Sequence, residues 1–171
     1  MGYRDPTYVV FDGDKDKWAY AYMKGWKNNE NIDFDFRDAH DLDGMTGNAQ
    51  NEDYVKRNLR ERMRQAKAVV VLIGESTKNL YRFVRWEIDL ANELGLPIIA
   101  INLNGMRQQD ANRVPPIIRD KCVVHVSFKM KIIKHALDNW PGEFARLSSA
   151  DRAAGARFYA DSVYEGLGLS D

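Results

Sequence analysis

Hydrophobic residues are arranged along the chain in short runs that predict five β-strands. The runs are bounded by glycine, proline and polar residues, and they cover residues 7–11, 33–37, 68–73, 97–101 and 122–126. The third run, Ala68–Ile73, is continuous and rich in β-branched residues, which is typical of a strand buried on both faces of a parallel sheet. Gly74 ends this run and separates it from the next segment.

Between the strands, apolar residues recur every three or four positions, which predicts amphipathic helices. These segments lie at residues 18–26, 51–66, 80–91 and 130–140, with a further helix over about residues 148–165. The fourth helix should end at Pro141, because proline interrupts the hydrogen bonds of a helix. The last helix should begin with a capping box formed by Ser148 and Asp151.

The alternation of strands and helices predicts an α/β fold with three layers, in which helices cover both faces of a five-stranded parallel sheet. By analogy with common five-stranded domains, we expect the flavodoxin-like strand order 2-1-3-4-5. A chain of 171 residues is long enough for one well-packed core and too short for two domains of ordinary size. We therefore expect one domain over residues 1–171, with a core at about 7–140 and the last helix packed on it.

Glu87 departs most from this pattern, because it places a carboxylate in an apolar helical stripe. Helical spacing puts it on the same face as Val84 and Ile88, which should pack on the sheet. The segment follows the third strand, and ligands of open α/β sheets bind beyond the carboxyl ends of the strands. Glu87 is therefore a candidate catalytic residue. The alternative is a solvated glutamate at the edge of the stripe, or one paired with Arg82 or Arg85.

The charge of the chain argues against two classes of partner. Lys plus Arg and Asp plus Glu both total 25, so the formal net charge is zero and no basic field would attract nucleic acid or an anionic membrane. No stretch approaches the roughly 20 apolar residues that span a bilayer. Cys122 is the one cysteine and has no partner for a disulfide, which suits a reducing compartment. We expect a cytoplasmic protein that binds neither nucleic acid nor membrane.

The sequence lacks the residues that several common functions of α/β folds require. A phosphoacceptor receiver needs an aspartate where the third strand ends, and this chain has Ile73 and Gly74 there. A dinucleotide-binding Rossmann domain needs a glycine-rich first turn, but residues 12–16 are mostly aspartate. The histidines are widely separated, and no zinc-binding spacing is present. We therefore expect neither a metal site nor a bound cofactor.

Acidic residues follow the first three strands of the predicted sheet. Asp12 and Asp14 come after the first strand, and Asp38 comes after the second. With strands 1 and 3 adjacent, these side chains and Glu87 should converge on one crevice. A buried carboxylate there suits cleavage of an N-glycosidic bond, because the transition state carries positive charge on the ribose. Nicotinamide in NAD+ is a cationic leaving group that lowers the need for a general acid, so the lack of a second obvious catalytic residue is compatible with NAD+ as a substrate.

Two adjacent stretches resemble a known family. A strand that ends in Val-Leu-Ile-Gly at residues 71–74 leads to a helix with the motif Phe-Val-Arg-Trp-Glu-Ile at residues 83–88. This pair is similar to the TIR-like proteins of the Thoeris anti-phage system, of the ThsB type. The similarity runs from the first strand to about Asn104. It includes the turn at residues 11–14 and the Asp-Ala pair at residues 38–39.

The resemblance implies a flavodoxin-like TIR fold that turns over NAD+, with Glu87 as the catalytic residue. It implies release of nicotinamide and production of an ADP-ribose-derived signalling nucleotide, often cyclised, that activates a partner effector protein after phage infection. A phage-derived trigger and a homo-oligomer are expected as further partners. The side chains expected to line the substrate site are Phe11, Asp12, Asp14, Asp38, Arg85 and Trp86.

Two other functions fit the same sequence. A non-enzymatic TIR module would signal only by self-association, through its exposed charged helices and the polar loop after the second strand. An enzyme similar to nucleoside 2′-deoxyribosyltransferases would also use a carboxylate in a related sheet. Consumption of NAD+, dimerisation without nucleotide turnover, and nucleoside exchange distinguish the three functions.

Overall fold

Six strands form one sheet in the computed structural model, which describes residues 6–28, 37–38, 52–79 and 83–169. Neighbouring strands run parallel, in the order β2-β1-β3-β4-β5-β6. The strands are β1 (Pro6–Val10), β2 (Arg37–Asp38), β3 (Ala68–Ile73), β4 (Ile98–Asn102), β5 (Val124–Ser127) and β6 (Arg157–Phe158). The central strands β3 and β4 are buried along their whole length.

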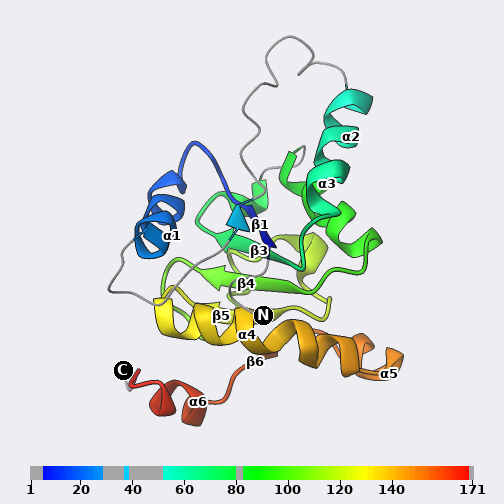
Figure 1. Ribbon diagram of the computed structural model, residues 1–171. Helices are drawn as coiled ribbons and strands as arrows, with labels where there is room; N and C mark the ends of the chain where they lie inside the picture. Colours follow the sequence, from blue (N-terminus) through cyan, green and yellow to red (C-terminus); the bar gives the residue numbers. More distant parts are fainter. Residues whose placement is uncertain (1–5, 29–36, 39–51, 80–82, 170–171) are drawn as a thin grey trace.

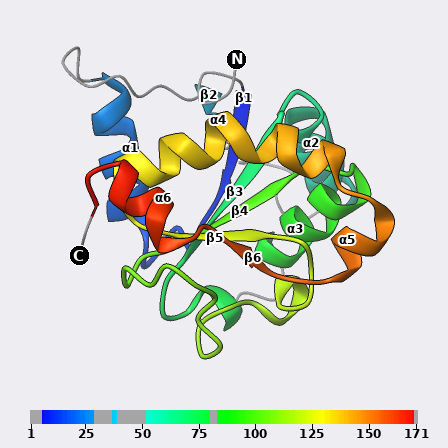
Figure 2. The same cartoon turned by 90° about the horizontal axis from the view of Figure 1, so that it is seen from below.

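Helices cover both faces of the sheet (Figure 1). On one face lie α1 (Lys17–Asn28) and α4 (Met130–Arg146), and on the other lie α2 (Glu52–Met63) and α3 (Phe83–Glu93). Shorter elements are the 3₁₀ helices η1 (Thr77–Asn79) and η2 (Pro116–Ile118) and the helices α5 (Ser149–Ala153) and α6 (Asp161–Gly166). Figure 2 shows the strands between the helical layers, with α1 on one side of the sheet and α3 on the other.

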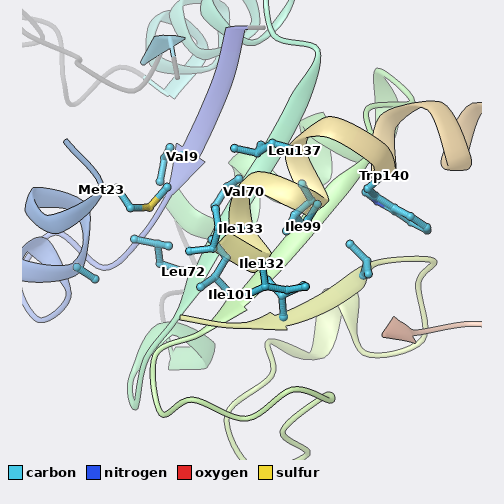
Figure 3. Close-up of a cluster of buried hydrophobic side chains, with 14 of the residues drawn as sticks. Val9, Met23, Val70, Leu72, Ile99, Ile101, Ile132, Ile133, Leu137 and Trp140 are labelled. Atoms are coloured by element: carbon cyan, nitrogen blue, oxygen red, sulfur yellow. The ribbon is translucent and has the colours of Figure 1, made fainter. Parts of the chain in front are cut away.

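Alternate residues of the strands divide the core into two apolar clusters. Figure 3 shows part of the cluster under α1 and α4, with labelled side chains of Val9, Met23, Val70, Leu72, Ile99, Ile101, Ile132, Ile133, Leu137 and Trp140. On the other face, Tyr8 and Val10 of β1 pack with Leu59 of α2 and Ile88 of α3. Each fully buried aliphatic side chain contributes about 1.5–3 kcal/mol. The two clusters therefore hold both helical layers on the sheet.

The fold class expected from the sequence is confirmed: the protein has an α/β, flavodoxin-like fold with a parallel sheet and helices on both faces. β3 has the predicted bounds, whereas β5 begins and ends later than the run at residues 122–126. β6 is not predicted, because a strand of two residues has no readable apolar pattern. Most of the strand predicted at residues 33–37 lies outside the described residues.

The predicted end of the fourth helix is wrong. α4 does not stop before Pro141 but continues to Arg146. Proline removes one backbone hydrogen bond from the helix interior. The continued helix brings Phe144 within 5.8 Å of Trp140, measured between ring centroids. Packing of these aromatic rings on the sheet offsets the lost hydrogen bond.

The helix expected over about residues 148–165 is instead divided into α5, β6 and α6. The capping box is present, because Ser148 Oγ accepts the N–H of Asp151 and the Asp151 carboxylate accepts the N–H of Ser148. Gly155 then adopts a φ of 94°, which is incompatible with a continuing α-helix. The chain adds β6 to the edge of the sheet and returns in α6, where Tyr164 is fully buried.

Candidate functional site

Glu87 lies under α3, on the side of the helix that faces the sheet. Its neighbours on that side, Val84 and Ile88, are buried as the apolar spacing predicts. Glu87 itself is only 3% exposed. The alternative of a solvated glutamate at the edge of the stripe therefore does not hold. Arg85 is exposed and pairs with Asp89 over 3.8 Å, and Arg82 lies outside the described residues.

The carboxyl group of Glu87 is hydrogen-bonded to the neighbouring strand. Tyr8 in the middle of β1 donates its phenolic O–H to Oε1 of Glu87 over 3.1 Å, and both residues are buried. Burial raises the pKa of Glu87 from its ordinary value of 4.5 to about 8, while the hydrogen bond from Tyr8 acts in the opposite direction. At neutral pH the group is therefore largely protonated in the unliganded protein. Buried carboxyls with such pKa values are enriched at functional sites.

A second polar cluster lies where β1 and β3 end. Oδ1 of Asp12 accepts hydrogen bonds from the N–H groups of Asp14 and Lys15, at 2.9 and 3.2 Å, which closes the turn after β1. Oδ2 of Asp12 accepts the hydroxyl of Ser76 at 2.8 Å, which ties this turn to the one after β3. Burial raises the pKa of Asp12, but these hydrogen bonds together outweigh it and hold the pKa below its ordinary value. Asp12 is therefore a carboxylate that organises two turns.

Asp16 belongs to the same cluster, although no motif in the sequence marks it. The one signal is its position before α1, which is typical of a helix cap. Its Oδ2 lies 3.3 Å from Oγ1 of Thr77, and that hydroxyl accepts the N–H of Gly74 at 2.9 Å. A Cβ at Gly74 would lie 2.3 Å from Oδ2 of Asp16, so only glycine fits there without movement. Burial, followed by the charge of Asp12, raises the pKa of Asp16.

The structure separates Phe11 from Glu87. The ring of Phe11 stacks on Tyr20 with ring centroids 4.7 Å apart, and it packs with the cluster under α1 and α4. Glu87 lies on the opposite face of the sheet, under α3. Asp14 is exposed in the turn after β1. The side chain of Asp38 lies outside the described part of the chain.

Trp86 is adjacent to Glu87 on α3 and extends towards α2. It is half-buried, and Lys56 of α2 places its ammonium group 4.6 Å from the centre of the indole ring. The described contacts thus form two clusters, one around Asp12 at the strand ends and one joining Glu87 to Tyr8. Tyr8 precedes Asp12 by four residues, which corresponds to about 13 Å of extended strand. Trp86 and Glu87 are consecutive residues of α3 with different partners, Lys56 and Tyr8, and Asp12 belongs to the separate cluster at the strand ends.

Neither a membrane span nor a metal cluster occurs in the described ranges. No helix among these residues is both long and apolar enough to cross a membrane. The same residues contain no group of three or more His, Cys, Asp or Glu side chains placed to hold a metal ion.

Comparison with known families gives a match that covers more than half of the chain. Residues 8–108 match the model described as Thoeris protein ThsB, TIR-like domain. The matched region includes Tyr8, Asp12, Asp16 and Glu87, and thus both polar clusters. The resemblance carried by residues 71–74 and 83–88 is therefore confirmed, and the protein belongs to the family of Thoeris ThsB proteins with a TIR-like domain.

Proposed function

We propose that this protein cleaves NAD+, releases nicotinamide and makes an ADP-ribose-derived signalling nucleotide. Membership of the Thoeris ThsB family suggests a role in anti-phage defence, and TIR-like domains often cleave NAD+. The observation that carries the proposal is the buried carboxyl of Glu87, hydrogen-bonded to Tyr8 beneath α3.

In the proposed reaction, the bond between ribose C1 and the nicotinamide nitrogen breaks. Its electron pair leaves with nicotinamide, which becomes neutral. Positive charge then develops on the ribose, and the carboxylate of Glu87 stabilises it electrostatically. A nucleophile from the same nucleotide adds to C1 and loses a proton, which gives the cyclic product that we propose. Addition of water gives linear ADP-ribose instead.

The protonation of Glu87 is part of this mechanism. A neutral carboxyl stabilises a cation poorly, and burial keeps the group largely neutral at pH 7 by raising its pKa to about 8. The pyridinium ring of bound NAD+ is a positive charge, and a cation within about 4–6 Å favours the ionised carboxylate. Substrate binding should therefore release a proton from Glu87. Tyr8 then donates its hydrogen bond to the anion.

The test of this function is nicotinamide release from NAD+ by the purified wild-type and Glu87→Gln proteins, alone and with extract of phage-infected cells. Glutamine keeps the size of the side chain and can accept the hydrogen bond from Tyr8, but it carries no charge. We expect the rate to fall by about 100- to 1,000-fold, as for loss of one electrostatic group that stabilises a transition state. Mass spectrometry of the products identifies the nucleophile.

Glu165→Gln is a matched control, because Glu165 is an exposed glutamate on α6, away from α3. It should release nicotinamide at the wild-type rate. Activity that persists in the Glu87→Gln protein removes Glu87 from the mechanism. Wild-type protein that leaves NAD+ intact in all of these mixtures contradicts the proposed reaction.

One observation favours a second function, a TIR module that signals by self-association. Trp18 and Tyr22 are 47% and 59% exposed on successive turns of α1, and large aromatic side chains are enriched at protein interfaces. Trp18 also packs edge-on against Phe128, with ring centroids 5.6 Å apart, so the patch has a fixed shape. Loss of assembly and signalling in Trp18→Ser and Tyr22→Ser variants, with no NAD+ consumed by the wild type, would favour this function over the enzyme.

We propose that the diffusible nucleotide product acts on an effector protein of the same anti-phage system. Because the signal is a small molecule, this chain and the effector need not form a complex. Effector activation by the filtered reaction mixture of the wild type, and not of Glu87→Gln, tests this step. If the effector is activated only when this protein is added back to the filtered mixture, the proposed step is contradicted.

A further inference from the structure

A groove of about 460 Å³ runs between α2 and α3. This α2–α3 groove is lined by Asp53, Lys56, Arg57, Leu59, Arg60, Trp86, Asp89, Leu90 and Glu93. Binding sites for small molecules typically have volumes of about 300–1,000 Å³. The groove is therefore large enough for a ligand of nucleotide size.

Glu87 lies on the flank of α3 that is nearest to this groove. Successive residues of a helix are rotated by about 100°, so Val84 and Ile88 lie on one side of the buried stripe and Glu87 and Leu90 on the other. Val84 and Ile88 line a different pocket, next to η2. Leu90 and Trp86 line the α2–α3 groove. A ligand in the groove would therefore lie beside the stretch of α3 that carries Glu87, although the buried carboxyl of Glu87 does not itself line the groove.

The lining combines an apolar floor, an aromatic wall, cationic side chains and the carboxylates of Asp53, Asp89 and Glu93. Glu93 is paired with Arg60, and Asp89 with Arg85. Leu59 and Leu90 are buried beneath the groove, and the indole of Trp86 forms a wall with Lys56 beside it. Arg57 is exposed there and forms no ion pair with another residue in the described parts of the chain. An apolar floor with an aromatic wall suits a flat base. Lysine and arginine side chains suit phosphate oxygens.

Towards the C-terminal ends of α2 and α3, the groove is lined by the ion pair of Arg60 and Glu93, with 2.9 Å between Nη2 and Oε1. From Glu87 to Glu93 the helix rises by about 9 Å over six residues. This length accommodates one nucleotide of a dinucleotide but not both. The second nucleotide would then extend past the opposite end of the groove, which is the end nearer to Glu87 along α3.

We propose that the α2–α3 groove binds the ADP part of the NAD+ substrate. Its phosphates would contact Lys56 and Arg57, and its adenine ring would lie on the floor formed by Leu59 and Leu90, beside Trp86. The inference rests on the proposed function, because it assumes a dinucleotide whose scissile ribose lies at Glu87. In this arrangement the groove selects the substrate by binding its adenine and phosphate groups, which take no part in the cleavage reaction.

The pocket on the other flank of α3 does not offer the same chemistry. It has a volume of about 290 Å³ and is lined largely by apolar residues, among them Pro115, Pro116 and Ile117. Two cationic residues line it: Lys78 donates a hydrogen bond to the carbonyl of Asn112, and Arg85 pairs with Asp89. The α2–α3 groove is therefore the better site for a phosphorylated ligand.

The test is isothermal titration calorimetry of the full-length protein with ADP, which lacks the nicotinamide ribose. We expect ADP to bind the wild type, and Arg57→Glu to weaken binding at least about tenfold, because the charge reversal repels phosphate. Trp86→Leu should also weaken binding, and Trp86→Phe, which keeps an aromatic wall, should restore most of it. Arg64→Glu makes the same charge reversal at an exposed residue outside the groove and should leave ADP affinity unchanged.

Absence of ADP binding to the wild type overturns the proposed site. Equal ADP affinities of the wild type, Arg57→Glu and Arg64→Glu proteins overturn it as well. Glu87→Gln should bind ADP like the wild type, so this titration is independent of cleavage. ADP binding that depends on Arg57, without any cleavage of NAD+, would refute the proposed reaction, and the proposed ADP site would still stand. If Arg57→Glu cleaves NAD+ with an unchanged KM, the proposed ADP site is refuted, and the proposed reaction still stands.

Discussion

Replacing Glu87 by glutamine should make the protein more stable, and increasingly so as the pH rises. The carboxyl group is buried beneath α3, where the charged form is disfavoured, and its pKa is raised from 4.5 to about 8. Between these two pH values, the folded protein retains a proton that the unfolded chain has released. The free energy of unfolding of the wild type therefore falls as the pH rises through this range, and the loss is complete above about pH 8.

The size of the effect follows from the difference between the two pKa values. Each pH unit in this range costs the wild type about 1.4 kcal/mol. The cost is therefore about 3 kcal/mol at pH 7 and about 5 kcal/mol above pH 8. Glutamine has nearly the same volume, can accept the hydrogen bond from Tyr8 and does not titrate. It should recover most of the 3 kcal/mol at about pH 7, which corresponds to a rise in Tm of roughly 6–12 °C.

Urea unfolding followed by circular dichroism measures this difference at about pH 5, 7 and 8. Glu165→Gln is the control, because it removes an exposed glutamate and should match the wild type at each pH. The gain in stability from Glu87→Gln should be small near pH 5 and largest at pH 8. A gain that stays constant across this range refutes the reasoning, as does a Glu87→Gln protein that is less stable than the wild type at pH 7.

Three further changes test other features of the structure. Tyr8→Phe removes the hydrogen bond that favours ionised Glu87, so the rise of nicotinamide release with pH should move to higher pH; an unmoved pH–rate profile contradicts this. Gly74→Ala places a Cβ 2.3 Å from Oδ2 of Asp16 and should cost about 1–3 kcal/mol in urea unfolding, whereas wild-type stability would show that the turn adjusts freely. Burial lowers the pKa of His125 to about 4, so the wild type should lose up to about 3 kcal/mol as the pH falls from 6.5 to 4. His125→Leu should remove this loss in acid unfolding, and an unchanged acid midpoint would contradict it.

Features that depend on spacing within one element can be predicted from the sequence. Ala68–Ile73 is an uninterrupted apolar run because the strand is buried on both faces, and its predicted bounds match those of β3. The inward orientation of Glu87 follows from the same rule, since it shares a helical face with Val84 and Ile88. These local patterns, together with the motif around Glu87, suffice to predict the fold class and the family.

Contacts between elements cannot be predicted in this way. The hydrogen bond from Tyr8 to Glu87 joins residues 79 positions apart and depends on how α3 sits over β1. Asp16 has the sequence context of a helix cap, and its burial arises from the approach of Thr77 in a distant turn. Pro141 shows how tertiary packing overrides a local signal, because aromatic contacts keep α4 helical beyond it.

The pH dependence of kcat/KM for nicotinamide release from NAD+ tests the central claim most directly, namely that Glu87 acts as a carboxylate from its buried position. This ratio reports ionisation of the free enzyme, and the pKa of Glu87 there is about 8. The wild-type value should rise about tenfold per pH unit up to about pH 8 and then level off, and Glu87→Gln should lack this rise. A wild-type profile that is flat between about pH 6 and 8, or the same rise in Glu87→Gln, would contradict the account.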